Sequence, residues 1–388
     1  HTASLAGGDA GAQAFLDRLG IRRASSLPVF LEALKLAHQF GHLASNRIAS
    51  ISCSGGEAAL AADTAHSTGL VFPTLTAQQH AKLSDALGPM VALANPLDYH
   101  TYIWRDAPAM TKAWAAMADP EIALTLLISD YPREDICDPS DWACVTDAAI
   151  AAAKLTQRPY AVVASLAELM PEHVAKRLME NGVAAINGLD HGIYALDLLT
   201  RPLPQGHAPV LLPGAERTAT LIDEHTAKQE LAQHGLQVPQ SAKISDRTSA
   251  AQAAQDIGFP VAVKILGLAH KTDADGLALG LKSVDEVEAA LRALAPGALL
   301  VEKMISGVVA ELLVGVIRDP AHGFVLTLAA GGTMTELLDD HTSLLVPAAR
   351  VHVVAALDRL KIAPLLHGYR GKPPTNFEAL LDVIDAVQ

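Results

Sequence analysis

The sequence predicts an α/β protein in two parts, a doubly wound parallel sheet followed by an α+β domain. Four short apolar runs that suit buried strands, with helix-like stretches between them, predict the first part. A proline-rich segment near residue 210 then separates it from a second part in which the elements follow a different order. The chain has 388 residues, enough for two or three domains of ordinary size.

The first part begins with a helix near Pro28, a residue suited to the first helical turn, and the apolar residues after it recur with helical spacing. Buried strands are expected at residues 47–52, 123–129, 160–165 and 183–187. Helices are expected at residues 58–68, 108–117 and 140–154. Strands that alternate with helices at this repeat length indicate a parallel sheet with helices on both faces.

The second part follows the segment TRPLPQGHAPVLLPGAER, which breaks both periodicities and fits an extended linker. Helices are expected at residues 223–234, with Asp223 as N-cap, and at 249–257. Strands are expected at residues 261–265, 298–301, 312–317 and 323–330. This order indicates an α+β unit.

Composition and charge exclude several classes of partner. With 42 acidic and 29 basic residues the formal net charge is −13, and no basic block with interleaved aromatic residues occurs, so nucleic acid is excluded. The longest apolar runs, such as EIALTLLIS, are far shorter than the ~20 residues that cross a bilayer, so no membrane is expected either. The three cysteines, Cys53, Cys137 and Cys144, lack C-x-x-C spacing and fit a reducing cytoplasm.

Two segments could handle phosphate. Ser54, Gly55 and Gly56 stand between an expected strand and an expected helix, where backbone N–H groups can hold an anion, although for such a motif alone a glycine turn for close packing is the more common explanation. His270 lies on a polar loop after the strand that contains Lys264, where an imidazole can accept a phosphoryl group, although a lone surface histidine is usually inert. Neither segment decides a function alone.

Two further groups of residues include charged side chains that could bind a nucleotide or a metal ion. Lys228 and Lys264 could neutralise nucleotide phosphates, and Glu302 and Glu311, near strand ends, could accept adenine or ribose donors; ordinary surface charge is the alternative. Gly331 and Gly332 precede Glu336 and Asp340, two carboxylates that could help to hold Mg²⁺ or could simply face solvent. No G-x-x-x-x-G-K-[ST] or H-E-x-x-H motif occurs.

Taken together, these segments resemble a known family. From about residue 221 the text EHTAKQELAQHGLQVP, AAQDIGFPVAVKILGLAHKTDADG, VEKMISGVVAELLVGVIRDPAHG, AAGGTMTELLDD and LLHGYRGKPP is similar to the ATP-grasp part of NDP-forming acyl-CoA synthetases, the acetate–CoA ligase (ADP-forming) family related to succinyl-CoA synthetase. The front half agrees through HTASLAGGDAGAQAFLDRLGIRR, ISCSGGEAALAADTA and ANPLDYHT. Several ordered motifs are more specific than any one of them.

The resemblance implies a fold and a division into domains. It implies a flavodoxin-like parallel sheet domain followed by an α+β ATP-grasp domain. The implied boundaries are 1–45 for the remnant of the first CoA-ligase domain, 46–200 for the succinyl-CoA-ligase-like domain, 201–217 for the linker and 218–388 for a C-terminally truncated ATP-grasp domain. A CoA-binding domain is then expected in cis or on a partner subunit, with an oligomeric assembly and a fragment that is incomplete alone.

The resemblance also implies roles for single residues. His1 is similar to the phosphorylated histidine at the acyl-CoA site and His270 to a second histidine that swings toward the nucleotide, while Ser54, Gly55 and Gly56 would hold the phosphoryl group. The other carried-over positions are Lys228 and Lys264 for phosphates, Glu302 for adenine, Glu311 for ribose, Glu336 and Asp340 as acidic positions without an assigned task, and Asn95 and Asp98 near the acyl site. No metal ligand set is assigned.

Two positions depart from the family pattern, and both concern phosphate handling. The usual pair of glycines after H-K-x-D-x is Asp275 and Gly276 here, and Leu344 replaces an arginine that follows the acidic pair. Tyr99, Tyr102 and Trp104 could line the acyl pocket, and core packing explains them as well.

The implied reaction is acyl-CoA + ADP + phosphate ⇌ carboxylate + CoA + ATP through acyl phosphate and phosphohistidine, with ATP or ADP, Mg²⁺ and CoA as cofactors or substrates. A small carboxylate or its CoA thioester is the expected second substrate. The alternative is a regulatory module that senses acyl-CoA or nucleotide, as in relatives fused to a protein acetyltransferase. Histidine at both matching positions favours the enzyme over this alternative.

Overall fold

The computed structural model describes residues 7–202, 209–211, 214, 215, 218, 220–267, 276–332 and 335–388. Its contacts divide the described residues into two compact units. One unit is Ile21–Leu203, and the other combines residues of His1–Gly20 with those of Pro204–Gln388. The implied boundaries at residues 45, 200 and 217 stay predictions.

The unit Ile21–Leu203 contains a five-stranded parallel sheet with the order β2-β1-β3-β4-β5. This is the flavodoxin-like order, so the expected fold class is confirmed. Every residue of β1, β3 and β4 is buried, as expected for strands covered on both faces. The strands are β1 (Ile48–Ser52), β2 (Leu97–Asp98), β3 (Leu124–Ile128), β4 (Tyr160–Ala164) and β5 (Val183–Asn187).

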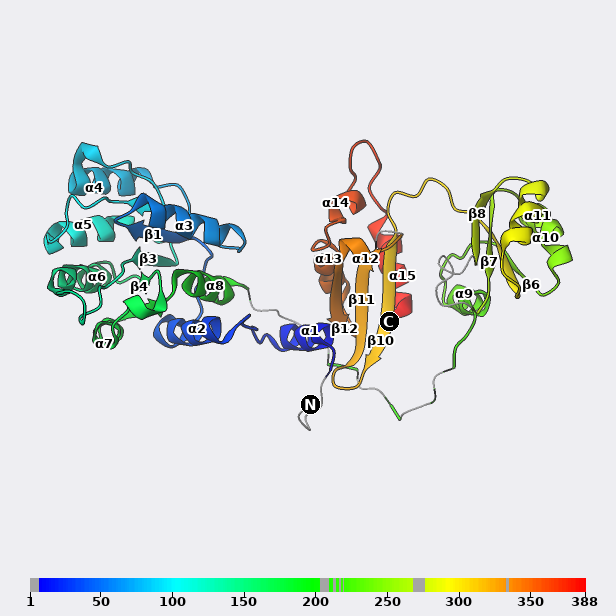
Figure 1. Ribbon diagram of the computed structural model, residues 1–388, viewed down its shortest axis with the longest axis horizontal. Coiled ribbons are helices and arrows are strands. Elements are labelled where there is room, and N and C mark those ends of the chain that lie inside the picture. Colours follow the sequence, from blue (N-terminus) through cyan, green and yellow to red (C-terminus); the bar gives the residue numbers. More distant parts are fainter. Residues whose placement is uncertain are drawn as a thin grey trace. The chain divides into compact units, whose positions relative to one another are not determined.

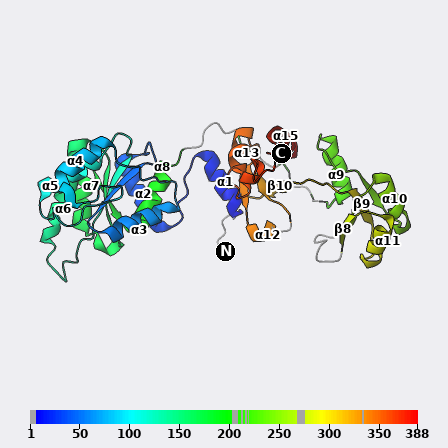
Figure 2. The same cartoon turned by 90° about the horizontal axis from the view of Figure 1, so that it is seen from above.

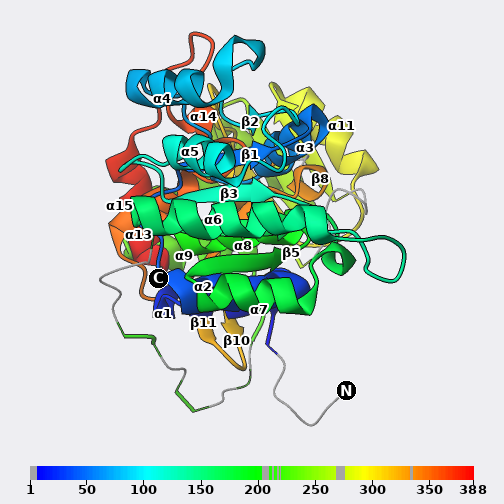
Figure 3. The same ribbon diagram turned by 90° about the vertical axis from the view of Figure 1, so that its left-hand side faces the viewer.

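Helices cover both faces of this sheet (Figure 1). Side chains of α4, α5, α6 and α7, among them Leu83, Met110 and Leu178, form one core with the strands, and Figure 3 shows these four helices lying side by side. Side chains of α2, α3 and α8, among them Leu36 and Ile193, form the core on the other face. The helices are α2 (Leu27–Phe40), α3 (Gly55–His66), α4 (Ala77–Leu87), α5 (Ala107–Met117), α6 (Ala143–Thr156), α7 (Glu172–Glu180) and α8 (Leu189–Thr200), with short 3₁₀ turns η1 (Gly88–Met90), η2 (Ser140–Trp142) and η3 (Ala167–Leu169).

The second unit contains a four-stranded antiparallel sheet with the order β6-β9-β7-β8. Helices α10 and α11 pack on it through Ala254, Val287 and Leu299, and Figure 2 shows them beside the sheet. The elements are α9 (Glu224–Gln233), β6 (Ser241–Ile244), η4 (Arg247–Ser249), α10 (Ala250–Ile257), β7 (Val261–Ile265), β8 (Leu277–Leu281), α11 (Val284–Ala293) and β9 (Leu299–Lys303).

The same unit contains a three-stranded antiparallel sheet, β10-β11-β12. Leu326, Leu357 and Ile384 form part of its core. The N-terminal helix α1 lies against β12, where the Arg18 side chain donates to the carbonyl oxygens of Leu345 and Pro347. The elements are α1 (Asp9–Leu19), β10 (Leu312–Asp319), β11 (Gly323–Ala330), α12 (Thr335–Leu338), β12 (His341–Leu345), α13 (Arg350–Leu357), α14 (Ala363–Leu366) and α15 (Phe377–Val387).

The expected strands agree with the observed ones apart from a few terminal residues, but four strands were not expected. These are β2, β6, β8 and β12. β2 has two residues, and β6, β8 and β12 are mostly half-buried, so none carries a buried apolar run. Among the described helices, none is long and apolar enough to cross a membrane.

Candidate active site

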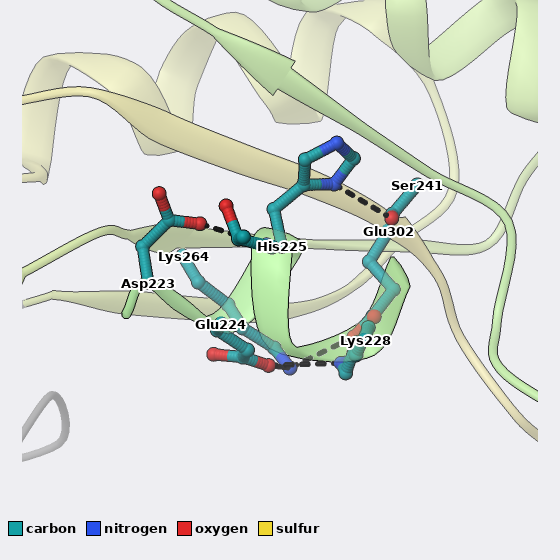
Figure 4. Close-up of polar contacts among 8 residues, drawn as sticks. Asp223, Glu224, His225, Lys228, Ser241, Lys264 and Glu302 are labelled. Carbon is teal, nitrogen blue, oxygen red and sulfur yellow. Dashed lines mark hydrogen bonds and ion pairs between the residues drawn. The ribbon is translucent and has the colours of Figure 1, made fainter. Parts of the chain in front are cut away.

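Two lysines and two glutamates meet beside the sheet β6-β9-β7-β8 (Figure 4). The Nζ atom of Lys264 lies 2.7 Å from Oε1 of Glu224 and 2.8 Å from Oε2 of Glu302. Lys228 Nζ lies 2.9 Å from Oε1 of Glu224 and also pairs with Oε1 of Glu302. We call these four residues the lysine–glutamate cluster.

The local structure explains why these four side chains meet. On the sheet, Ala262 pairs with Glu302 and Lys264 pairs with Leu300, so Lys264 and Glu302 lie diagonally on one face. On α9, Glu224 and Lys228 are four residues apart and so share one side of the helix. The strand expected at residues 298–301 extends further than predicted, so Glu302 lies within β9 and not after it.

Asp223 and Ser241 support α9 at the cluster. The Asp223 carboxylate caps the helix by accepting from the backbone N–H of Thr226 at 3.0 Å. Lys243, 2.8 Å away, lowers the pKa of Asp223 to about 2, and the Thr226 N–H adds to the effect. His225 Nδ1 lies 3.3 Å from the Ser241 hydroxyl (Figure 4).

The lysine–glutamate cluster is partly buried and combines two positive with two negative side chains. The side chains of Lys228, Lys264 and Glu224 are 22%, 19% and 25% exposed, and that of Glu302 is 7% exposed. Burial lowers the pKa of Lys264, but its hydrogen bonds to Glu224 and Glu302 outweigh burial and raise it overall. The Lys264 ammonium group therefore stays charged. Phosphate oxygens that displace the carboxylates can bind to it and to the neighbouring Lys228.

The Gly-rich turn lies at the start of α3, as expected. The Ser54 hydroxyl caps the helix by accepting from the N–H of Gly56 at 3.2 Å. Asp98 lies close to this turn, because a Cβ atom on Gly55 would come within 3.3 Å of its Oδ2 atom. Ser54, Gly55 and Gly56 are exposed, so an anion can reach the positive end of the helix.

Asn95 makes three hydrogen bonds to backbone groups. Its Nδ2 atom donates to the carbonyl oxygens of Ile48 and Pro73, each at 3.0 Å. Its Oδ1 atom accepts from the N–H of Ser50 at 3.1 Å. All three bonds tie the segment before β2 to β1 and to residue 73. The structure thus gives Asn95 a structural contact and leaves Asp98 as the member of this pair beside α3.

Glu311 and Gly331 lie together at the open end of the β10–β11 pair. The N–H of Gly331 donates to the Glu311 carbonyl oxygen at 2.8 Å. Gly332, with φ of 87°, is so close to Glu311 that a Cβ atom there would lie 2.8 Å from Oε2. The structure therefore brings Glu311 together with Gly331 and Gly332, which lie apart in the sequence.

Asp340 and Glu336 lie in different surroundings. Asp340 is 6% exposed, and its two oxygens accept from the N–H groups of Lys361 and Ile362 at 2.7 and 3.0 Å. Glu336 is exposed on α12. Among the described residues, no group of three or more His, Cys, Asp or Glu side chains could hold a metal ion.

The remaining predicted positions divide into three sets. His1, His270 and Asp275 lie outside the described residues. Leu344 lies in β12. Of the aromatic residues expected near the acyl group, Tyr99 and Trp104 line a cavity described below, whereas Tyr102 is 63% exposed and is not among its lining residues.

Sequence reasoning missed two features of these sites. Glu224 was not singled out, although its spacing of four residues from Lys228 could have indicated it. Glu57, four residues after Cys53, was not given a role either. Burial, followed by the charges of Asp130 and Asp98, raises the pKa of Glu57 to about 7.

Comparisons with known proteins find similarity to acyl-CoA-forming enzymes and to ATP-grasp domains. Residues 214–388 match a family of ATP-grasp domains. The chain is 28% identical over 402 residues to a trans-feruloyl-CoA synthase from an unknown prokaryotic organism, an alignment that covers 99% of this chain and 57% of that protein. It is 30% identical over 177 residues to subunit beta of acetate–CoA ligase [ADP-forming] II from Pyrococcus furiosus, covering 42% of this chain and 75% of that subunit.

A solved structure is also similar in sequence. It is the dinucleotide-forming acetyl-coenzyme A synthetase 1 of Ca. Korarchaeum cryptofilum, in complex with coenzyme A, Ca-AMPCP and HgCl⁺. The alignment covers 43% of this chain and 78% of that chain, with 28% identity and a TM-score of 0.40.

Proposed function

We propose a function from the premise that this chain belongs to the family of ADP-forming acetate–CoA ligases. The protein interconverts acyl-CoA, ADP and phosphate with a carboxylate, CoA and ATP. The observation that carries this proposal is the lysine–glutamate cluster, in which Lys228 and Lys264 meet within the residues that match an ATP-grasp domain. Two adjacent ammonium groups are what the phosphates of a nucleotide require.

The described residues fit a nucleotide. Lys228 and Lys264 bind its phosphates and neutralise the charge that is spread over the transferred group. Glu302, next to both lysines, accepts a donor of the adenine ring, and Glu311 is assigned to the ribose. Mg²⁺ enters with the nucleotide, and no residue of this chain is assigned to it.

Phosphoryl transfer in this scheme runs through two histidines. A phosphate oxygen attacks the thioester carbon and CoA leaves as a thiolate, which gives the acyl phosphate. His1 attacks phosphorus and the carboxylate leaves; the phosphoryl group then passes to His270 and on to a terminal oxygen of ADP. Each step breaks one bond to the transferred group and forms another. Ser54, Gly55 and Gly56 hold the phosphoryl group on His1 at the start of α3.

The scheme also assigns partners and a compartment. A CoA-binding domain, in cis or on a partner subunit, binds CoA, and the working protein is an oligomer. The three cysteines are free, which supports a reducing cytoplasm. The relatives compared are named as synthases and ligases, so the regulatory module has no support among them.

Labelling tests this function. Full-length protein is incubated with [γ-³²P]ATP and Mg²⁺, and we expect protein-bound label that survives base and is lost in acid. His270→Asn should abolish turnover, whereas His80→Asn, at an exposed position of α4, should not change it. Turnover at the wild-type rate in His270→Asn would overturn the proposal.

A further inference from the structure

A cavity of about 530 Å³ lies at the carboxyl ends of β1 and β3. The chain leaves β1 toward β2 on one side and returns to β3 on the other, so this is the point where the strand order reverses. In open α/β sheets, ligands bind in the crevice at such a point. Neither the phosphoryl transfer scheme nor the lysine–glutamate cluster uses this cavity.

Aromatic side chains dominate one part of its wall. The chain has three tryptophans, and all three, Trp104, Trp114 and Trp142, line the cavity together with Tyr99. Trp104 and Trp142 meet edge to face with ring centroids 5.4 Å apart, and Tyr99 and Trp114 do so at 6.4 Å. Such paired rings form rigid apolar walls that suit a flat aromatic ligand. A two-carbon acyl group would leave most of this volume unfilled.

Two polar atoms of the wall have no partner. The Nε1 atom of Trp114, a residue 2% exposed, and the Oε2 atom of Glu57 are both buried without a hydrogen bond. A buried polar atom without a partner is unfavourable, so a ligand that supplies the partner gains affinity. The indole N–H can donate to a ligand oxygen, and the Glu57 carboxyl group can pair with a hydroxyl group.

The cavity also reaches the reaction centre of the proposed function. Cys53 and Glu57, which flank the turn formed by Ser54, Gly55 and Gly56, both line it. An acid whose apolar end fills the cavity can therefore present its carboxyl group at this turn. Ser129 and Asp130, which follow β3, also line the cavity, and the Asp130 carboxylate accepts from the N–H and hydroxyl of Ser165.

We propose that this cavity binds the acyl group of the substrate and that this group is aromatic, with a hydrogen-bonding substituent that meets Glu57 and Trp114. The proposal rests on the proposed function, which requires a carboxylic acid or its thioester. It adds the substrate class, an aryl-substituted carboxylate.

Tryptophan fluorescence tests the proposal directly, because all three tryptophans of this chain lie in the cavity wall. Full-length protein without nucleotide is titrated with 3-phenylpropanoate, 3-(4-hydroxyphenyl)propanoate and acetate, and calorimetry confirms each affinity. We expect saturable fluorescence changes with both aryl acids and none with acetate. The hydroxylated acid should bind more tightly, by about tenfold, the effect of one hydrogen bond in a dry pocket.

Matched variants assign the binding to the cavity. Trp142→Ala should weaken aryl binding about tenfold or more. Tyr102→Ala, an aromatic residue nearby that is 63% exposed, should not change it. Glu57→Leu should abolish the preference for the hydroxylated acid while binding of 3-phenylpropanoate persists.

The proposal falls if acetate binds as tightly as the aryl acids, or if Trp142→Ala leaves aryl affinity unchanged by calorimetry. Failure of the proposed function is read separately, from the acid-labile label that [γ-³²P]ATP leaves on the same preparation. Label without aryl binding rejects this inference alone, and aryl binding without label rejects the phosphoryl transfer scheme.

Discussion

Lys264 on β7 and Glu302 on β9 lie diagonally across neighbouring strands, with their charged atoms 2.8 Å apart. Because the Glu302 side chain is only 7% exposed, its charge depends on Lys264 and Lys228 for compensation. A phosphate that binds the lysines competes with Glu302 for the same two ammonium groups. Nucleotide affinity and folding stability are therefore coupled at the same atoms.

Lys264→Met tests this coupling. We expect ADP affinity to fall about tenfold or more, and stability to fall by about 1–3 kcal/mol, because Glu302 keeps only one cation. Calorimetry with ADP and urea unfolding measure the two effects. Lys243→Met, which removes the partner of Asp223 on the same sheet, is the control and should leave ADP affinity unchanged. Full ADP affinity in Lys264→Met would remove this lysine from the nucleotide site.

Glu57 should make stability depend on pH. Burial and the charges of Asp130 and Asp98 raise its pKa from 4.5 to about 7, so the folded protein binds a proton more tightly than the unfolded chain. The stabilisation is complete below about pH 4.5 and is lost as pH rises through 7. Glu57→Gln does not ionise, so its stability relative to wild type should increase by roughly 1 kcal/mol from pH 5 to 8, a value reduced for a half-buried group.

Urea unfolding at several pH values measures this difference. Glu168→Gln, at an exposed position of η3, should follow the wild-type profile. A constant gap between Glu57→Gln and wild type from pH 5 to 8 would show that Glu57 does not titrate in this range.

Asn95→Ala should destabilise the flavodoxin-like unit by about 2–3 kcal/mol, because three hydrogen bonds to the backbone are lost at about 1 kcal/mol each. Asn181→Ala loses two side-chain bonds at an exposed place and should cost less. Thermal or urea unfolding compares them. Equal stability of wild type and Asn95→Ala would contradict the structural role and favour a role at the acyl site.

Asp319 anchors the start of α1. Its carboxylate accepts from the N–H groups of Gly8 at 2.8 Å, Ala321 at 2.8 Å and His322 at 2.9 Å. These hydrogen bonds, the one from the Gly8 N–H most of all, lower the pKa of Asp319 to about 2. The contribution of Asp319 to folding stability is therefore present above about pH 3.8 and is lost as pH falls through 2.

Asp319→Ala should therefore cost about 1–3 kcal/mol at neutral pH and release α1 to proteolysis. Asp17→Asn, on an exposed position of the same helix, should change stability by less than about 0.5 kcal/mol. If both variants are cleaved at the wild-type rate, the contact of Asp319 with Gly8 does not hold the helix.

Gly331 permits the close approach of β11 to Glu311. A Cβ atom at Gly331 would lie 3.1–3.2 Å from the carbonyl carbon, carbonyl oxygen and Cβ of Glu311. Gly331→Ala should cost about 1–2 kcal/mol, because backbone must move. Gly315→Ala, in the same strand pair with its nearest neighbour 3.8 Å away, is the control and should be tolerated. Equal unfolding midpoints for the two variants would reject this account.

Most strands and helices could be predicted from the sequence because their patterns are local. The runs that became β1, β3, β4, β5 and β7 are continuous and apolar, and such runs predict buried strands whatever the rest of the chain does. β2 could not be found, because two residues carry no periodicity; its identity depends on pairing of Ile51 with Leu97. The motifs around Ser54, Lys228, Lys264 and Glu302 could be recognised because they are defined by residue types and their order along the chain.

The tertiary structure alone decided which side chains meet. Lys228, Lys264 and Glu302 lie far apart in sequence, and only the pairing of β7 with β9 and the placement of α9 bring them onto Glu224. The turn of Asn95 toward β1, and the gathering of all three tryptophans around one cavity, likewise depend on strand order. The local pattern of apolar residues determines whether a segment forms a helix or a strand. Pairing between distant segments determines which side chains lie close together, and a binding or catalytic site requires several such side chains at one place.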